Sequence, residues 1–321
     1  MNLKNIGFYT LNDKRAKEAS EKSPLQRCEL LITSRCNFKC PYCRGTTYKG
    51  DIPYEKAINY LNIWINEGLR NVRFTGGEPT LHKNLIQIVD YSKKHNVEHI
   101  AISTNGSAKL DYYRELIKSG VNDFSISLDG GCCEIGDLMS GGVKGSWNNV
   151  VDNIRELSKI TYVTVGMVFT ESNINECIES VLFADSLGVS DIRVIPSAQF
   201  NQALIKLENL SENVLNKYPI LRYRINNIKQ GRHVRGISET DYHKCPLCLD
   251  DMAVASGYHF PCVIYMREQG EPIGRLTSNV RLDRKIWFEN HDTFKDKICK
   301  ENCLDVCKDY NHKWREYHEI H

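Results

Sequence analysis

The chain has 321 residues, of which 41% are hydrophobic and 26% are charged. This composition supports a sizeable core and excludes intrinsic disorder as the main state. The 42 Lys and Arg residues nearly balance the 40 Asp and Glu residues, so the formal net charge of +2 predicts no nucleic-acid or membrane partner. No apolar export segment opens the sequence and no long uncharged apolar stretch follows, so we expect a cytoplasmic protein.

Thirteen cysteines are unusual for a chain expected in a reducing compartment, where disulfides do not persist. Metal binding is the more natural explanation, because the cysteines are grouped along the chain. They form three clusters: Cys36, Cys40 and Cys43; Cys245, Cys248 and Cys262; and Cys299, Cys303 and Cys307. The remaining four, Cys28, Cys132, Cys133 and Cys177, are scattered.

Short β-branched runs alternate with amphipathic stretches from about residue 26 to 196, which predicts βα units around a parallel sheet. We expect six strands, at 28–33, 71–75, 99–103, 123–127, 162–169 and 191–196, with helices such as 54–69 and 174–187 between them. Six units are too few for a closed eight-stranded barrel. The prediction is therefore an α/β fold, a partial (β/α)6 TIM barrel, with its chemistry at the carboxyl ends of the strands.

The sequence changes character near residue 231, where Cys, Gly, Asp and Asn become frequent and two short strands are expected at 252–255 and 259–263. A segment with so little core of its own usually needs metal or docking for stability. We therefore expect an N-terminal extension at 1–24, the partial barrel at 25–230 and a small cysteine-rich iron–sulfur domain at 231–321.

The first cysteine cluster directly follows the first expected strand, with spacing CxxxCxxC over residues 36–43. Three thiolates suit a [4Fe–4S] cluster whose fourth iron stays open. A zinc site is the alternative, but zinc usually takes four ligands and no local residue completes the set.

These residues resemble the signature of the radical S-adenosylmethionine (SAM) superfamily, with Tyr42 as the aromatic residue before the last cysteine. Three strand ends are similar to further segments of that family: Thr75-Gly76-Gly77-Glu78-Pro79, Ser103-Thr104-Asn105-Gly106 and Ser127-Leu128-Asp129-Gly130. The resemblance implies that Cys36, Cys40 and Cys43 hold the cluster and that its open iron chelates SAM. It also implies that one electron cleaves SAM to a 5′-deoxyadenosyl radical, which abstracts hydrogen from a substrate.

The same resemblance implies cofactor-binding residues. Tyr42 is expected near the adenine, and Gly76, Gly77 and Glu78 near the methionyl amino group. Thr104, Asn105 and Ser127 are expected around the remainder of SAM.

Cys245 and Cys248, followed by Cys262, predict a second metal site, since Gly257 is placed to turn a hairpin that returns Cys262 to the pair. We favour an auxiliary [4Fe–4S] cluster over zinc. The spacing resembles the GTP cyclase family of molybdenum-cofactor synthesis and also the SPASM and twitch domains. Leu249-Asp250-Asp251 stands where the cyclases carry arginines, and the chain ends without their glycine tail, which argues against GTP.

Cys299, Cys303 and Cys307 are spaced so that a helix would place all three on one face, from which one could complete the auxiliary cluster. Whether there are one or two auxiliary clusters, and whether an auxiliary iron is open, stays undecided at this point. Cys132 and Cys133 are candidates for a hydrogen-atom donor or crosslinking thiol, against the simpler interpretation that they are loop cysteines without chemistry.

The sequence thus predicts a radical SAM enzyme that oxidises or crosslinks a peptide or small molecule, assisted by the auxiliary cluster. A cyclase or rearrangement enzyme with substrate bound to that cluster is the alternative. A non-catalytic cysteine-rich metal-binding or sensing protein is the alternative of a different class. A low-potential electron donor such as flavodoxin or ferredoxin is implied, whereas substrate, product and oligomeric state are left open.

Overall fold

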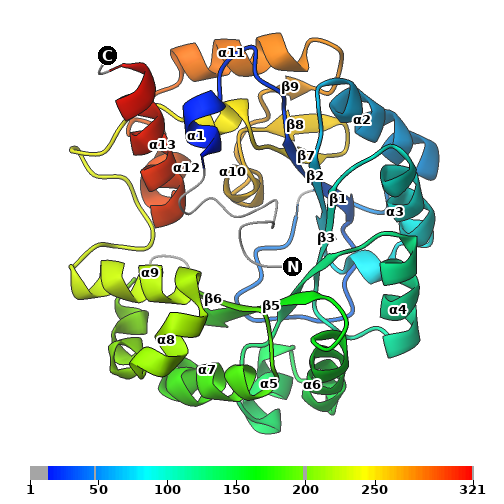
Figure 1. The fold of residues 1–321 in the computed structure, drawn as a ribbon, viewed down its shortest axis with the longest axis vertical. Coiled ribbons are helices and arrows are strands. Elements are labelled where there is room, and N and C mark those ends of the chain that lie inside the picture. Colours follow the sequence, from blue (N-terminus) through cyan, green and yellow to red (C-terminus); the bar gives the residue numbers. More distant parts are fainter. Residues whose placement is uncertain (1–13, 47, 198–200, 320–321) are drawn as a thin grey trace. The chain divides into compact units, whose positions relative to one another are not determined.

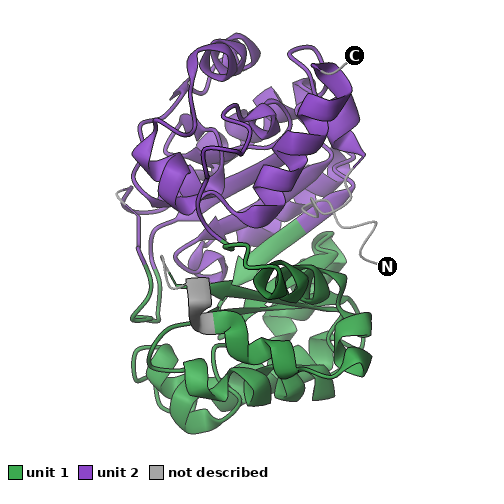
Figure 2. Ribbon diagram, turned by 90° about the vertical axis from the view of Figure 1, so that its left-hand side faces the viewer, with its two compact units in different colours: residues 1–6, 36–43, 101–234 green, residues 7–35, 44–100, 235–321 purple. Residues whose placement is uncertain are grey.

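The computed structural model describes residues 14–46, 48–197 and 201–319, so the first 13 residues of the expected extension lie outside the described part. Within it the chain divides into two compact units (Figure 2). Unit 1 holds residues 36–43 and 101–234, and unit 2 holds residues 14–35, 44–100 and 235–319. The loop of the first cysteine cluster therefore belongs to unit 1, and the C-terminal cysteines belong to unit 2.

The six expected strands are present nearly at their predicted bounds. They are β1 (Arg27–Thr33), β2 (Asn71–Gly76), β3 (His99–Thr104), β4 (Asp123–Ser127), β5 (Tyr162–Phe169) and β6 (Asp191–Pro196). Their side chains are almost all buried, which is why the sequence shows continuous β-branched runs rather than alternation. The prediction of βα units is confirmed.

Unit 1 contains a parallel sheet in the order β6-β5-β4-β3, to which β3 contributes from Ala101 onward. Near their carboxyl ends Thr104 pairs with Ile126 and Ser127 pairs with Gly166, so the ends of β3 and β4 lie at the same edge of the sheet. Helices lie outside these strands (Figure 1). They are α4 (Leu110–Ser119), α5 (Cys133–Met139), α6 (Ser146–Leu157), α7 (Cys177–Ser186), α8 (Glu212–Lys217) and α9 (Pro219–Lys229), with 3-10 turns η3 (Ile174–Glu176) and η4 (Asn201–Asn209).

Unit 2 contains the sheet order β2-β1-β7-β8-β9, with β7 (Ala253–Ala255), β8 (Tyr258–Phe260) and β9 (Gly274–Arg275). β7 pairs parallel with β1 through Glu29 and Ala253, and β7 and β8 form the expected hairpin. Ser256 and Gly257 turn this hairpin with φ of 48° and 83°. The cysteine-rich segment thus extends an existing sheet, which gives it support that it cannot supply from its own small core.

Short helices complete unit 2. They are α1 (Arg15–Glu18), α2 (Tyr54–Asn66), η2 (Pro79–Leu81), α3 (Leu85–Lys94), η5 (Pro246–Leu249), α10 (Val263–Arg267), α11 (Val280–Asn290), α12 (Lys297–Asn302) and α13 (Asp305–His318). The described part of the N-terminal extension packs on α13, where Ala16 and Ala19 join Leu247, Tyr310 and Trp314 in one buried cluster. None of the helices in the described part of the chain is long and apolar enough to cross a membrane.

The prediction of one helix through Cys299, Cys303 and Cys307 is wrong. α12 ends at Asn302, and Cys303 and Leu304 are extended, with ψ of 133° and 150°, before α13 begins. Leu304 forms an isolated antiparallel bridge with Arg235, so a long-range backbone contact accompanies the break.

Candidate functional site

The loop of the first cysteine cluster begins three residues after the end of β1 and carries three cysteines, none of which forms a disulfide. Cys36 and Cys43 are exposed and Cys40 is half-buried. The backbone N–H of Cys43 donates to the carbonyl of Cys40 at 3.0 Å, and the N–H of Lys39 donates to the carbonyl of Ser140 at 3.0 Å. These bonds fold the loop into a compact turn and attach it to the segment after α5, so the thiols are presented together.

The end of β3 supports this loop through Asn105. Its side-chain amide donates to Oδ1 of Asn37 at 2.9 Å and lies 3.9 Å from Sγ of Cys36. Asn37 in turn donates to Oγ of Ser107 at 2.9 Å. The predicted SAM-binding residue Asn105 is therefore in contact with the first cysteine of the cluster.

Tyr42 joins the loop to the end of β4. Its hydroxyl donates to Oδ2 of Asp129 at 2.5 Å, and the other carboxylate oxygen accepts the N–H of Val168 at 2.7 Å. Burial raises the pKa of Asp129 to about 6, although both hydrogen bonds oppose the shift. Burial, followed by the nearby Asp129, raises the pKa of Cys40 to about 11, so this thiol is protonated at neutral pH until a metal displaces its proton.

One pocket of unit 1 collects several predicted residues. It is lined by Cys40, Tyr42, Asn105 and Ser127, together with Phe38, Leu128, Asp129, Gly136, Met139, Ser140, Ser146, Trp147 and Val150. Thr104 is buried in β3 instead, where its hydroxyl lies 3.1 Å from the Tyr113 hydroxyl. Cys132 and Cys133 are half-buried at the start of α5 and are not among the residues that line this pocket.

Gly76 and Gly77, in unit 2, occupy positions where no side chain fits. A Cβ on Gly76 would lie 2.2 Å from the carbonyl oxygen of Thr33, and one on Gly77 would lie 2.3 Å from that of Arg35. The N–H of Gly77 donates to the Thr33 carbonyl at 2.8 Å. The glycines thus allow the end of β2 to approach the chain that leaves β1.

Two further side chains shape this segment. Glu78 is fully buried and accepts bonds from the N–H of Thr80 at 3.0 Å and its hydroxyl at 2.7 Å. Arg267, from α10, donates to the carbonyl of Gly76 at 2.8 Å. Sequence reasoning missed Arg267, because a contact across 191 positions leaves no local signal.

The C-terminal cysteines come from four different elements and meet around one apolar pocket. Cys245 precedes η5, and Cys262 caps α10 by accepting the N–H of Tyr265 at 3.4 Å. Cys299 lies in α12, Cys303 directly follows α12, and Cys307 lies in α13. All five line the pocket, beside Ile237, Leu247, Pro261, Ile264, Trp287 and Ile298. Cys248, in η5, is completely buried nearby. Although α12 and α13 are separate helices, they bring Cys299, Cys303 and Cys307 to the same pocket as Cys245 and Cys262.

The apolar surroundings hold these thiols in their neutral form. Burial raises the pKa of Cys262 to about 12, with Cys245 as the next cause, and raises the pKa of Cys303 and Cys307 well above the ordinary value. Because a metal ligates the thiolate, binding must release these protons. These cysteines can therefore act as metal ligands once they lose their protons.

Arg284 is the buried cation of this region, and no sequence pattern pointed to it. Its guanidinium donates to the carbonyls of Cys248 at 2.5 Å, Asp251 at 2.6 Å and Phe260 at 3.1 Å. It thereby holds the backbone of the turn after Cys245 against the strand that leads to Cys262. Its positive charge would also partly offset the negative charge of thiolates that ligate a metal.

Asp250 forms a buried ion pair with Arg27, with Nη2 and Oδ2 separated by 2.6 Å. Leu249 is likewise buried, at 3% exposure. The segment Leu249-Asp250 therefore serves packing and charge pairing between η5 and β1.

Comparisons with known sequences identify related proteins. Residues 30–184 match the sequence model of the Radical SAM superfamily. A GTP 3′,8-cyclase from Nautilia profundicola is 26% identical over 255 residues, covering 73% of this chain and 79% of the relative. A GTP 3′,8-cyclase from Helicobacter pylori (strain HPAG1) is 25% identical over 256 residues, with the same two coverages.

Solved structures show the same fold. Streptococcus suis SuiB bound to the precursor peptide SuiA matches with a TM-score of 0.60 at 15% identity, covering 89% of this chain and 76% of that chain. Native anSMEcpe with bound AdoMet and Cp18Cys peptide matches with a TM-score of 0.59 at 16% identity, covering 91% and 96%. The predicted α/β fold class, a partial barrel followed by a cysteine-rich segment, is confirmed. Residues 30–184 thus form a domain of the Radical SAM superfamily, whose enzymes use a [4Fe–4S] cluster together with S-adenosylmethionine.

Proposed function

We propose that this protein cleaves SAM reductively at a [4Fe–4S] cluster held by Cys36, Cys40 and Cys43, and that it uses the resulting radical to oxidise or crosslink a peptide or small molecule. The observation that carries the proposal is the loop of three cysteines, none in a disulfide, beside a pocket lined by Cys40, Tyr42, Asn105 and Ser127. When bound, the cluster and SAM supply a 5′-deoxyadenosyl radical that abstracts hydrogen. The chain itself positions the loop, through Asn105 and through the Tyr42–Asp129 bond.

The C-terminal pocket fits a second [4Fe–4S] cluster better than a zinc ion. Tetrahedral zinc draws thiolates to within about 4 Å of one another, since each Zn–S bond is only about 2.3 Å. Within the described residues, three potential ligand atoms lie within 4.8 Å of one another at His291, Asp296 and Cys299. Only one of these three is a thiol. The other thiols are instead spread around the apolar pocket. We propose Cys245, Cys248 and Cys262, completed from Cys299, Cys303 and Cys307, as the ligand set.

Iron counting tests both clusters together. After anaerobic reconstitution we expect about eight irons per chain, because each [4Fe–4S] cluster holds four. With SAM and dithionite, 5′-deoxyadenosine should form. Zinc with no SAM cleavage would instead support the non-catalytic metal-binding alternative.

Cysteine variants separate the two sites. The triple variant Cys36→Ala, Cys40→Ala, Cys43→Ala should lose about four irons and all 5′-deoxyadenosine formation. The triple variant Cys245→Ala, Cys248→Ala, Cys262→Ala should also lose about four irons, yet still cleave SAM, because the first loop lies outside unit 2. Cys177→Ala, in a buried helical position, is the matched control and should keep the full iron count. An unchanged iron count in either triple variant would refute that ligand assignment.

A cyclase reaction is the second candidate, because the sequence relatives that span about three quarters of the chain are GTP 3′,8-cyclases. It predicts that SAM, dithionite and GTP together yield a cyclised nucleotide. Since Leu249 and Asp250 are buried and Asp250 pairs with Arg27, this segment offers no cation to a triphosphate. We therefore expect GTP to remain unchanged, and its consumption would overturn our first choice.

Electron supply and cellular location complete the proposal. We infer a low-potential donor such as flavodoxin or ferredoxin, because reductive cleavage of SAM needs one electron from outside the chain. None of the thirteen cysteines forms a disulfide, which supports a location in the reducing cytoplasm.

A further inference from the structure

His291 follows α11 and lies beside the C-terminal cysteine pocket. Its Nε2 is 3.8 Å from Sγ of Cys299 and 3.7 Å from Oδ2 of Asp296. The thiol of Cys299 lines the pocket. Sequence reasoning assigned His291 no role, because it lies eight positions before that cysteine and the start of α12 falls between them.

Asp296 is already occupied by two other donors. Its Oδ2 accepts the Tyr265 hydroxyl at 2.9 Å, and its Oδ1 accepts the backbone N–H of Cys299 at 2.8 Å, which caps α12. The neutral Cys299 thiol can itself donate to the Asp296 carboxylate, whereas a thiolate at Cys299 has no proton to donate and can only accept. The imidazole N–H is therefore available to the sulfur once Cys299 is deprotonated.

Aromatic packing fixes the orientation of the imidazole. The ring of Trp287 stacks on it with centroids 4.0 Å apart and an interplanar angle of 18°. Tyr265 meets it edge-on, with centroids 6.3 Å apart at 85°. The two aromatic contacts therefore hold the imidazole of His291 beside the sulfur of Cys299.

We propose that His291 donates an Nε2–H hydrogen bond to the Cys299 thiolate when Cys299 ligates the auxiliary cluster, and that this bond raises the reduction potential of the cluster. Reduction adds negative charge that is shared by the ligating sulfurs, so a donor to one of them stabilises the reduced form. Hydrogen bonds to ligands from outside the ligand set commonly tune metal centres in this way. The inference rests on the auxiliary cluster of the proposed function.

The test is an EPR-monitored redox titration of the reconstituted, full-length protein. The variant lacking Cys36, Cys40 and Cys43 identifies which signal belongs to the auxiliary cluster. His291→Phe keeps a flat ring for the Trp287 stack but has no N–H. We expect it to shift the ratio of reduced to oxidised auxiliary cluster about tenfold toward the oxidised form at fixed potential, or about 59 mV for a one-electron couple. The iron count should not change.

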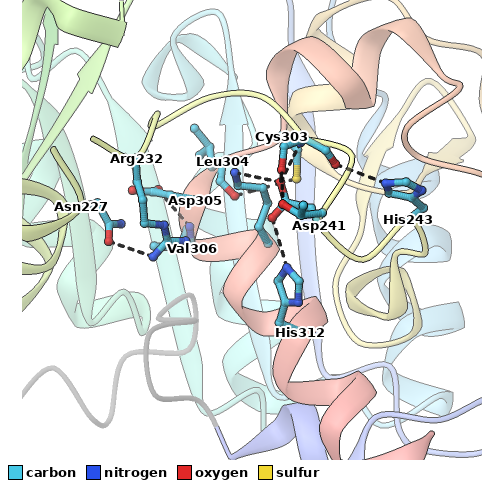
Figure 3. Close-up of polar contacts among 12 residues, drawn as sticks. Asn227, Arg232, Asp241, His243, Cys303, Leu304, Asp305, Val306 and His312 are labelled. Carbon is cyan, nitrogen blue, oxygen red and sulfur yellow. Dashed lines mark hydrogen bonds and ion pairs between the residues drawn. The ribbon is translucent and has the colours of Figure 1, made fainter. Parts of the chain in front are cut away.

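Two further variants complete the design. His291→Gln carries a side-chain amide that can donate to the sulfur, so it should restore part of the potential. His312→Phe is the matched control, since Nε2 of His312 faces Asp241 at 3.1 Å instead of a cysteine (Figure 3). It should leave the potential unchanged.

Two results would overturn the inference. An unchanged potential in His291→Phe would show that no N–H reaches the sulfur. Loss of about four irons in that variant would show that His291 is itself a ligand or holds the site together. Failure of the underlying auxiliary cluster looks different, because the unmutated protein would then hold only about four irons.

Discussion

The buried pair of Arg27 and Asp250 offers a quantitative test of how unit 2 is held together. The Arg27 side chain is 0% exposed and the Asp250 side chain 3%, and their bond is 2.6 Å long. Arg15 Nε lies 3.7 Å from the same carboxylate oxygen, and the Arg27 guanidinium lies 5.9 Å from the ring of Tyr310. The pair connects the first strand of the sheet to the turn that carries Cys248.

Arg27→Met should lower the free energy of unfolding by about 3 to 5 kcal/mol, because it leaves the Asp250 carboxylate buried without its main partner. The more distant Arg15 remains, so we expect the lower end of that range. The double variant Arg27→Met, Asp250→Leu removes both charges and should recover most of the loss, since well-packed apolar replacements of buried pairs are often neutral.

Urea denaturation of the metal-free chain measures these differences. Arg70→Met is the matched control: Arg70 and Glu98 are similarly close, at 2.7 Å, but their side chains are 55% and 49% exposed. An exposed pair contributes only about 0 to 1 kcal/mol. Equal losses from Arg27→Met and Arg70→Met would refute the argument from burial, as would a double variant weaker than Arg27→Met alone.

Two further predictions concern close packing and pH. Gly77→Ala places a Cβ 2.3 Å from the Arg35 carbonyl oxygen, so it should lower the free energy of unfolding by about 1 to 3 kcal/mol and weaken SAM binding. Gly166→Ala should be tolerated, because its Cβ would lie 3.9 Å from the nearest atom. Equal melting temperatures of the two variants would contradict this prediction. Burial, followed by Arg284, lowers the pKa of His259 to about 3, so the stability from keeping it neutral is present above pH 6.5 and lost as pH falls toward 3. The urea midpoint of the metal-free chain should therefore fall less between pH 7 and pH 5 in His259→Gln than in the unchanged protein. Equal decreases in the two proteins would show that His259 does not titrate as described.

The sequence determined what short-range patterns encode. Six buried parallel strands produce continuous β-branched runs, so their positions were predictable to within a residue or two. The grouped cysteines and the strand-end segments around Gly76, Asn105 and Ser127 pointed to the superfamily, because that chemistry uses residues close together in the chain. The turn at Gly257 was likewise readable, since a left-handed backbone favours glycine.

Only the tertiary structure decided how distant residues support these sites. The break between α12 and α13 at Cys303 accompanies a bridge from Leu304 to Arg235, and no local residue announces it. The carbonyl contacts of Arg267 and Arg284 and the pairing of Arg27 with Asp250 join segments up to 223 positions apart. Such contacts depend on which surfaces the fold brings together. A buried charge is stabilised by that arrangement rather than by its neighbours in sequence, and for this reason the sequence alone left these residues without a role.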